Sequence, residues 1–470
     1  MTKNFIETGH LKATVDPLFN NGKEIFWYGP IYFWFTAVPV KLFGLSIFTF
    51  RITALLFGFL DIYLVYRLFR LFISDIKVVF AGILLLASDT LFCYNIHSGR
   101  MDSMAFCFVL ISWYLFFLAD IPAEVPARTD SKKKYSLSPD VLIILSGIFA
   151  GISLLTTLRV YFLFIPVGFI LLINAVRTKS IKPIYHGFLF GTPPTVFLLL
   201  WLFFSFGSFY DFYIDYKYIS SLLDVAFHIR LLQYPIIFFT IVSVCYGFTK
   251  NGMENFYKNI FVLSFTSIIL FYLLIEDTSA YSFFILSCYY FLFVYSLQPL
   301  AKITFRNFQT IIFLLMFTWS IGVLSAKTLD LIFLYPQRNS SEINEFIQKN
   351  IPPGHKVIGD EMYYYAVENS GSDFQYIHLS RLSGNMIIKE KYQREKYNYD
   401  YIIWSDRLQQ IEPNILKLYA KNTELKKIAS FDLPSPKFHD IFKLLGVNVI
   451  ASYNCRIYQR EKKEKISRGR

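Results

Sequence analysis

The stretch SGRMDSMAFCFVLISWYLFFLA, Ser98–Ala119, joins a short polar segment to a long apolar one. Its apolar part, residues 101–119, approaches the length of about 20 residues that a helix needs to cross the hydrocarbon layer of a bilayer. Its polar part places Arg100 and Asp102 where that helix begins. The stretch therefore predicts a membrane-spanning helix with a basic and an acidic side chain at its start.

Similar apolar segments recur along most of the chain. Of its 470 residues, 54% are hydrophobic and only 17% are charged, whereas soluble domains carry about 25% charged residues. The segments lie at 50–72, 78–95, 101–119, 141–157, 160–176, 186–206, 231–249, 257–275, 280–298 and 308–332, after an apolar stretch at 28–46. We therefore expect an all-α polytopic membrane protein with about 10 transmembrane helices, of which the short pair around Arg159 is tilted or re-entrant.

The basic residues predict the orientation of these helices. They cluster in alternate connections, which is the pattern of loops on the cytoplasmic side of a membrane. The clusters contain Arg67, Arg70 and Lys77; Arg128 and Lys132–Lys134; Arg177, Lys179 and Lys182; Lys250 and Lys258; Lys302 and Arg306. Residues 95–101, Arg159 and the region after 335 then face outward. Membrane topology accounts for the net charge of +12, and no nucleic-acid-binding signature accompanies it, so we expect no nucleic-acid partner.

The C-terminal region has a different character. Asn339 and Glu342 have the spacing of a helix cap, and Ile343, Phe346 and Ile347 give a short amphipathic helix. KVIGD, YDYIIWS and KIASFDL are typical of strands. We expect a small extracytoplasmic α/β domain at 335–459 and a basic, disordered tail at 460–470, after an outer loop with an amphipathic aromatic segment at 1–46 and a helical membrane domain at 47–334.

Several catalytic motifs are missing from the sequence. It has no Asp-x-Asp pair, no glycine-rich phosphate loop, no His-Glu-x-x-His zinc helix and no Gly-x-Ser-x-Gly elbow. An enzyme with a soluble nucleotide donor is therefore disfavoured. The sequence predicts no cofactor and leaves the question of a divalent metal open.

The polar residues near the predicted outer face permit two interpretations. Asp102 is suited to the first turn of a helix, where the helix dipole favours an anion, and Arg100 to an interfacial anchor. The same two side chains, with His97, are also suited to a binding or catalytic site. The segment FWYGPIYFWF, Phe26–Phe35, is either an interfacial aromatic belt or a surface helix that covers a cavity for a lipid headgroup.

Two acids lie within apolar segments. Asp61 is in the middle of its predicted helix, where a charge costs about 2.5–3.5 kcal/mol on insertion scales. Such a residue is a functional candidate, but an interhelical hydrogen bond explains it equally well. Asp89 lies nearer the outer end of its helix and is expected to line the same cavity as Asp102.

The order of these segments resembles that of a known family. ETGHL, YGPIYFW, LFGLSIFTFRI and the Ser98–Ala119 stretch follow one another, and GISLLTTLRVYFLFIP and FIQKNIPPGHKVIG come later. The chain resembles, over nearly its whole length, the membrane glycosyltransferases with the GT-C fold, which include the protein O-mannosyltransferases and the lipid A aminoarabinose transferases. The resemblance implies transfer of a sugar from a polyprenyl-phosphate donor to a hydroxyl acceptor at the outer face.

The resemblance also implies roles for particular residues. Asp102 matches the acidic position of the second outer loop and is the expected catalytic carboxylate. Arg100 matches the basic residue before it, and Arg159 is a candidate for the donor phosphate. We add three further candidate substrate-binding residues, His97, His10 and Tyr28. The expected partners are a polyprenyl-phosphate sugar, membrane lipids and an acceptor that is a protein, a lipid or a glycan, in a bacterial inner or plasma membrane.

The chain departs from the family pattern at its start. Members begin with one more transmembrane helix and an Asp-Glu pair whose first acid is the expected base. Here the sequence starts just past that point, and Glu7 is too close to Gly9 to match the pair. Two alternatives therefore stay open: a transporter or flippase of lipid-linked sugars that uses Asp61 and Asp89, and an inactive truncated member that binds a lipid-linked glycan.

Overall fold

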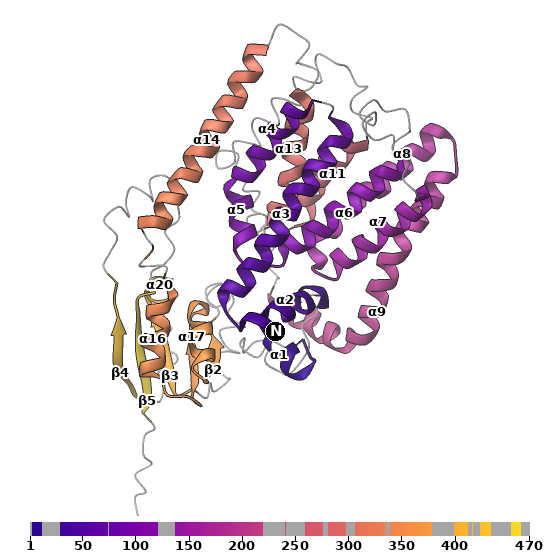
Figure 1. Cartoon of the computed structure of the whole chain (residues 1–470). Helices are drawn as coiled ribbons and strands as arrows, with labels where there is room; N and C mark the ends of the chain where they lie inside the picture. Colours follow the sequence, from indigo (N-terminus) through magenta and orange to yellow (C-terminus); the bar gives the residue numbers. More distant parts are fainter. Residues whose placement is uncertain are drawn as a thin grey trace, which may run out of the picture.

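A computed structural model gives the architecture of the chain (Figure 1). It describes residues 2–11, 29–73, 75–120, 137–219, 240, 259–275, 281–297, 306–333, 335, 339–377, 399–411, 416, 424–433 and 453–461. Two regions are apparent in it: a bundle of apolar helices and a small α/β unit beside one end of that bundle.

The helices of the bundle follow the apolar segments of the sequence. Their bounds are α2 Pro30–Phe43, α3 Ile47–Phe72, α4 Ile76–Ser88, α5 Thr90–His97, α6 Asp102–Asp120, α7 Pro139–Leu154, α8 Ile165–Thr178, α9 Lys182–Ile219, α11 Asn259–Leu274, α13 Phe283–Leu297 and α14 Arg306–Phe333. Within the described ranges, four helices are long and apolar enough to span a membrane, or five if one bent pair is a single span. The chain is therefore an integral membrane protein, and the count of about 10 spans stays a prediction.

The bent pair is α4 and α5, which together cover the single apolar segment 78–95 of the sequence. The two helices meet at an angle of 62°. Asp89 ends α4 and caps α5, because its Oδ1 accepts hydrogen bonds from the backbone N–H groups of Leu91 and Phe92 at 2.8 and 3.1 Å. A side-chain cap satisfies donors that a continuous helix would satisfy with its own carbonyls. The chain therefore changes direction at Asp89.

A second irregularity lies between α7 and α8. After α7 ends at Leu154, the short 3-10 helix η2, Leu158–Leu163, carries Arg159. It leads directly into α8, so that residues 158–178 together have the length and apolarity of a span.

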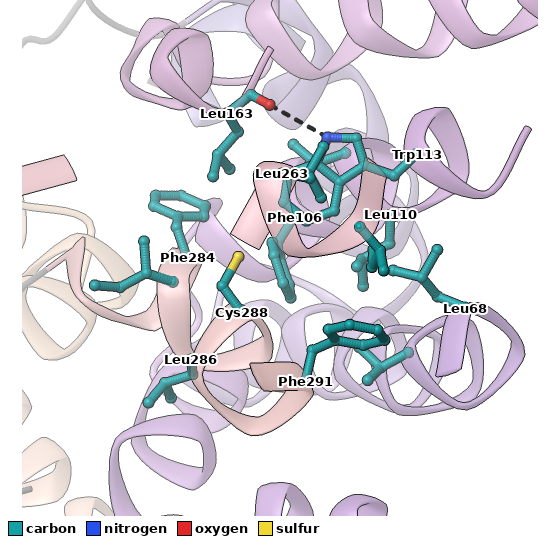
Figure 2. Close-up of a cluster of buried hydrophobic side chains, with 14 of the residues drawn as sticks. Leu68, Phe106, Leu110, Trp113, Leu163, Leu263, Phe284, Leu286, Cys288 and Phe291 are labelled. Atoms are coloured by element: carbon teal, nitrogen blue, oxygen red, sulfur yellow. Dashed lines mark hydrogen bonds between the residues drawn. The ribbon is translucent and has the colours of Figure 1, made fainter. Parts of the chain in front are cut away.

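Helix α6 occupies the centre of the bundle. In the apolar part of α6, 72% of the residues are buried, compared with 6% in the apolar part of α9. Helix α9 therefore lies at the periphery. Figure 2 shows Phe106 and Leu110 of α6 in one cluster with Phe284 and Phe291 of α13, and Trp113 of α6 beside Leu263 of α11. The Trp113 indole N–H donates a hydrogen bond to the Leu163 carbonyl at 3.2 Å. The core thus fixes α6 against α13 and against η2.

The C-terminal α/β unit has five strands in the order β2-β1-β3-β5-β4. Its elements are α16 Ser340–Asn350, β1 Lys356–Gly359, η5 Glu361–Tyr363, α17 Tyr364–Asn369, β2 Asp373–Tyr376, β3 Tyr401–Ser405, α20 Asp406–Ile411, β4 Glu424–Phe431 and β5 Cys455–Glu461. Strand β1 is parallel to β2 and β3, while β5 is antiparallel to β3 and β4. The predicted helix is present with Asn339 as its cap, and β5 extends two residues into the segment expected to be a tail.

The N-terminal elements lie at the same end of the bundle as the α/β unit (Figure 1). Helix α1, Thr2–Thr8, packs on α2, and the Thr2 and Thr36 hydroxyls are 3.1 Å apart. Helix α2 has 14 residues, which gives a length of about 21 Å, shorter than a hydrocarbon layer of about 30 Å. For the apolar stretch at 28–46, the structure therefore favours a helix that does not cross the membrane.

Candidate active site

The site is centred on the turn between α5 and α6. Gly99 has a φ of 73°, in the left-handed region that glycine adopts without strain. The Tyr32 hydroxyl of α2 donates a 2.5 Å hydrogen bond to the Gly99 carbonyl. On its other side, a Cβ at Gly99 would lie 3.1 Å from Phe50 Cβ and 3.5 Å from the backbone nitrogen of Arg51. The turn is therefore held between α2 and the first turn of α3.

This turn places Arg100 and Asp102 in direct contact. Arg100 Nε donates to Asp102 Oδ2 at 2.6 Å. The Asp102 side chain is buried, whereas 39% of the Arg100 side chain is exposed. Two residues at this spacing do not share a face within one helix. They meet here because Arg100 lies in the turn and Asp102 is the first residue of α6.

A tyrosine brings a second arginine to the same place. The guanidinium carbon of Arg100 is 5.3 Å from the centre of the Tyr281 ring, and that of Arg159 is 4.2 Å from it. Tyr281 is only 7% exposed and precedes α13. The aromatic ring thus joins the turn before α6 to η2, two segments that lie far apart in the sequence.

The three charged groups give the site a net positive charge. Arg159 lies close enough to Asp102 for their charges to attract each other, as Arg100 does. The buried Asp102 carboxylate therefore lies near two guanidinium groups, both of which contact the Tyr281 ring. Guanidinium groups match the geometry of phosphate and carboxylate oxygens, so the arrangement can bind an anion beside a carboxylate that can accept a proton.

The other substrate-binding residues predicted from the sequence, His97, His10 and Tyr28, are not among the contacts described above. His97 is exposed, and its Nδ1 lies 2.6 Å from the Cys93 carbonyl of its own helix. His10 is also exposed, just after α1, and its backbone N–H donates to the Thr8 hydroxyl at 3.2 Å. Tyr28 lies outside the described residues. Tyr281 was not identified from the sequence, because an aromatic residue at the end of an apolar segment carries no signal that distinguishes it from an interfacial anchor.

The two acids within the apolar segments contact other helices. Asp61 is fully buried, and Ser103 donates to its Oδ2 at 3.0 Å. This contact is the interhelical hydrogen bond that the sequence allowed as an alternative. Asp89 caps α5, and the Tyr290 hydroxyl donates to its Oδ2 at 2.9 Å. Within the part of the chain that the structure describes, no three His, Cys, Asp or Glu side chains are grouped as metal ligands.

The fold and this site define a polytopic membrane protein with a cationic site at the end of the bundle that carries an α/β unit. No protein-family profile and no curated protein sequence matches the chain. Its structure, however, is similar to that of ArnT from Cupriavidus metallidurans bound to undecaprenyl phosphate, with a TM-score of 0.57 and 12% identity over 97% of this chain and 91% of that one. The apo state of the same protein gives a TM-score of 0.55 at 12% identity, with the same coverage of both chains.

A second solved structure is similar at a lower level. The Archaeoglobus fulgidus oligosaccharyltransferase, in complex with Zn and sulfate, has a TM-score of 0.51 and 12% identity over 93% of this chain and 67% of that one. The expected resemblance in fold to the GT-C membrane glycosyltransferases is thereby confirmed.

Proposed function

We propose that this protein is a glycosyltransferase that moves a sugar from a polyprenyl-phosphate donor to a hydroxyl acceptor at the outer face of the membrane. The observation that carries the proposal is the ion pair of one buried carboxylate, Asp102, with Arg100, whose guanidinium group shares the Tyr281 ring with that of Arg159. Such a site combines a proton acceptor with a phosphate-binding group. The similarity in fold to ArnT, whose structure was determined with undecaprenyl phosphate, supports this choice of donor class.

The proposed reaction assigns a step to each charged group. The acceptor hydroxyl oxygen forms a bond to the anomeric carbon while its proton passes to Asp102. The bond between that carbon and the phosphate oxygen breaks, and the electron pair leaves with the phosphate. Arg100 and Arg159 stabilise the charge that develops on the leaving phosphate. General-base assistance of this kind is worth about 10²–10⁴-fold in rate.

The two basic residues at the C-terminal end of α3 support the outward orientation of the site. Arg67 and Arg70 lie near that end, whereas the Gly99 turn contacts Phe50 near the N-terminal end, where the helix has a single basic residue, Arg51. Because basic residues accumulate on the cytoplasmic side of a membrane, the Arg100–Asp102 pair is assigned to the opposite side.

The transporter alternative requires acids that are available to a substrate within the membrane. Asp61 and Asp89 instead accept hydrogen bonds from Ser103 and Tyr290, and Asp89 also caps α5. These contacts explain both acids by the packing of the bundle. We therefore favour glycosyl transfer over transport.

The test uses the purified full chain in lipid nanodiscs with undecaprenyl-phosphate sugars that carry a hexose, a pentose or an amino sugar. Membrane-lipid and glycan extracts serve as acceptors, and mass spectrometry measures the undecaprenyl phosphate released. We expect Asp102→Asn to lower the rate at least about 100-fold. The matched control is Asp140→Asn, since Asp140 is also a first-turn acid with a basic partner, His186 at 3.2 Å.

Three results would contradict the proposal. Full activity of Asp102→Asn would show that Asp102 acts only as a first-turn acid. Movement of intact lipid-linked sugar across the membrane by the wild type, without release of undecaprenyl phosphate, would establish the transporter instead. An inactive wild type that still binds the donor would support the binding-only alternative.

A further inference from the structure

The α/β unit contacts the membrane bundle through α17. Lys3 of α1 forms an ion pair with Glu368 of α17. Asn369 donates from Nδ2 to the Leu45 carbonyl at 3.5 Å, just before α3. The centres of the Tyr365 and Phe50 rings are 6.3 Å apart. These contacts fix α17 over the N-terminal end of α3.

Helix α17 lies at the carboxyl ends of the parallel strands, which is where open α/β sheets bind ligands. Strand β1 has β2 on one side and β3 on the other, all parallel, so the direction of strand succession reverses at β1. Ligands of open α/β sheets lie outside the carboxyl ends of the strands at such a point. Helix α17 comes just after the carboxyl end of β1, and Tyr453 precedes β5 opposite the carboxyl end of β3. Tyr365 and Tyr453 therefore both lie at the carboxyl ends of β1 and β3.

Arg51 lies between the carboxyl ends of these strands and the Gly99 turn. Its side chain is exposed and acts electrostatically on the hydroxyl groups of Tyr365 and Tyr453. Among the residues that the structure describes, no carboxylate forms an ion pair with it. Its backbone nitrogen borders Gly99, the residue before Arg100. The Arg51 guanidinium group, which forms no ion pair with a described carboxylate, thus lies beside the candidate active site.

We propose that Arg51, Tyr365 and Tyr453 form an acceptor subsite, which binds a sugar ring that carries a phosphate or carboxylate group. This inference rests on the proposed glycosyl transfer and adds the class of the acceptor. Arg51 would bind the anionic group through paired N–H donors. The tyrosine rings offer partly negative faces to the C–H groups of the sugar.

The hydroxyl groups of the two tyrosines suit this role. Burial raises the pKa of Tyr365 to about 12, although Arg51 opposes the shift. Burial likewise raises the pKa of Tyr453. Both hydroxyls therefore stay protonated at neutral pH and can donate hydrogen bonds to the oxygens of a sugar.

The subsite and the donor site are separated by the Gly99 turn. Phe50 contacts Gly99 on one side, and the Arg100–Asp102 pair follows directly on the other. An acceptor held at Arg51 would therefore lie beside the turn that carries the Arg100–Asp102 pair. The cation of the acceptor subsite is distinct from the two arginines assigned to the leaving phosphate.

The test measures binding to the full chain in nanodiscs by saturation-transfer NMR, with N-acetylglucosamine 6-phosphate, glucuronate and uncharged N-acetylglucosamine as probes. We expect at least one charged probe to bind about tenfold more tightly than N-acetylglucosamine, since a charge-assisted hydrogen bond is roughly twice as strong as a neutral one. Arg51→Gln should remove this difference, and Tyr365→Leu should weaken all three probes. Arg177→Gln is the control, because Arg177 is an exposed arginine in the last turn of α8.

Undecaprenyl phosphate is measured in parallel as a probe of the donor site. Its affinity should change less than about twofold in Arg51→Gln, because this arginine is not part of the pair around Tyr281. The acceptor subsite is overturned if neither charged probe prefers the wild type over Arg51→Gln while undecaprenyl phosphate binds both. Failure of undecaprenyl phosphate to bind the wild type would instead overturn the proposed donor. Tyr365→Phe, which keeps the ring next to Phe50, checks that loss of sugar binding in Tyr365→Leu does not reflect unfolding.

Discussion

The guanidinium group of Arg159 lies over the ring of Tyr281, with 4.2 Å between the guanidinium carbon and the ring centre. Arg100 approaches the same ring at 5.3 Å. Two cations repel each other, and the negative faces of an aromatic ring offset that repulsion. Tyr281 is therefore a positioning residue that permits both arginines to face Asp102.

Substitution of Tyr281 tests this arrangement. Each cation–π contact is worth about 0.5–2 kcal/mol, so we expect Tyr281→Leu to weaken the binding of undecaprenyl phosphate about tenfold. Tyr281→Phe keeps the ring and should bind within about twofold of the wild type. The measurement is the dissociation constant of undecaprenyl phosphate in nanodiscs. Equal affinities of the Leu and Phe variants would show that the ring does not position the arginines.

Asp61 provides a test of the transporter alternative. Its carboxylate is fully buried, and its Oδ1 has no hydrogen-bond partner among the described residues. A buried charge of this kind is costly, whereas an asparagine keeps an acceptor for Ser103 without the charge. We therefore expect Asp61→Asn to retain glycosyl transfer within about twofold and to unfold at the same or a higher temperature. Complete loss of function in this variant would instead identify Asp61 as part of a substrate pathway.

The sequence predicted those features that depend on local pattern. Apolar length located the helices of the bundle that the structure describes, and the short segments KVIGD, YDYIIWS and KIASFDL located strands β1, β3 and β4. The closeness of Arg100 and Asp102 was also accessible, because both residues lie at one junction between a turn and a helix. The break at Asp89 was missed, although Asp before Thr90 is a helix-start signal, because the apolar run continues on both sides of it.

The features that were missed depend on contacts between distant segments. Tyr281 meets Arg159 because η2 and the start of α13 pack against the same end of α6, and no local pattern encodes that packing. The same holds for α17 over Phe50, which joins residues more than 300 positions apart in the sequence. A single sequence gives the elements, whereas the site requires their arrangement.

Gly29 permits the close approach of α2 to the end of α7. A Cβ at this position would lie 1.7 Å from the Leu155 carbonyl oxygen and 2.7 Å from Leu155 Cα, which are backbone atoms. We expect Gly29→Ala to destabilise the fold by about 1–3 kcal/mol, measured as a lower midpoint of thermal unfolding in detergent. Gly168→Ala is the control, since no atom lies within 4 Å of its added Cβ and alanine favours a helix by about 1 kcal/mol. Unchanged stability of Gly29→Ala would mean that α2 does not pack against Leu155.

Asp360, just after β1, makes the stability of the α/β unit depend on pH. Burial raises the pKa of its carboxyl group above 3.8, although Arg407 and the Ser405 hydroxyl, which donates at 2.9 Å, oppose the shift. Because the folded pKa exceeds the unfolded one, the folded state binds more protons. Asp360 therefore contributes stability that is complete below pH 3.8 and is lost as the pH rises through the raised pKa.

We accordingly expect Asp360→Asn to reduce the difference in stability of this unit between about pH 4 and about pH 7, by about 1.4 kcal/mol for each unit of pKa shift. Hydrogen exchange of the backbone amides in β1 and β3 measures this stability in the full chain. The exposed acid Asp373 gives a matched control, and Asp373→Asn should keep the pH dependence of the wild type. The same pH dependence in Asp360→Asn and the wild type would show that the buried carboxyl group is not its source.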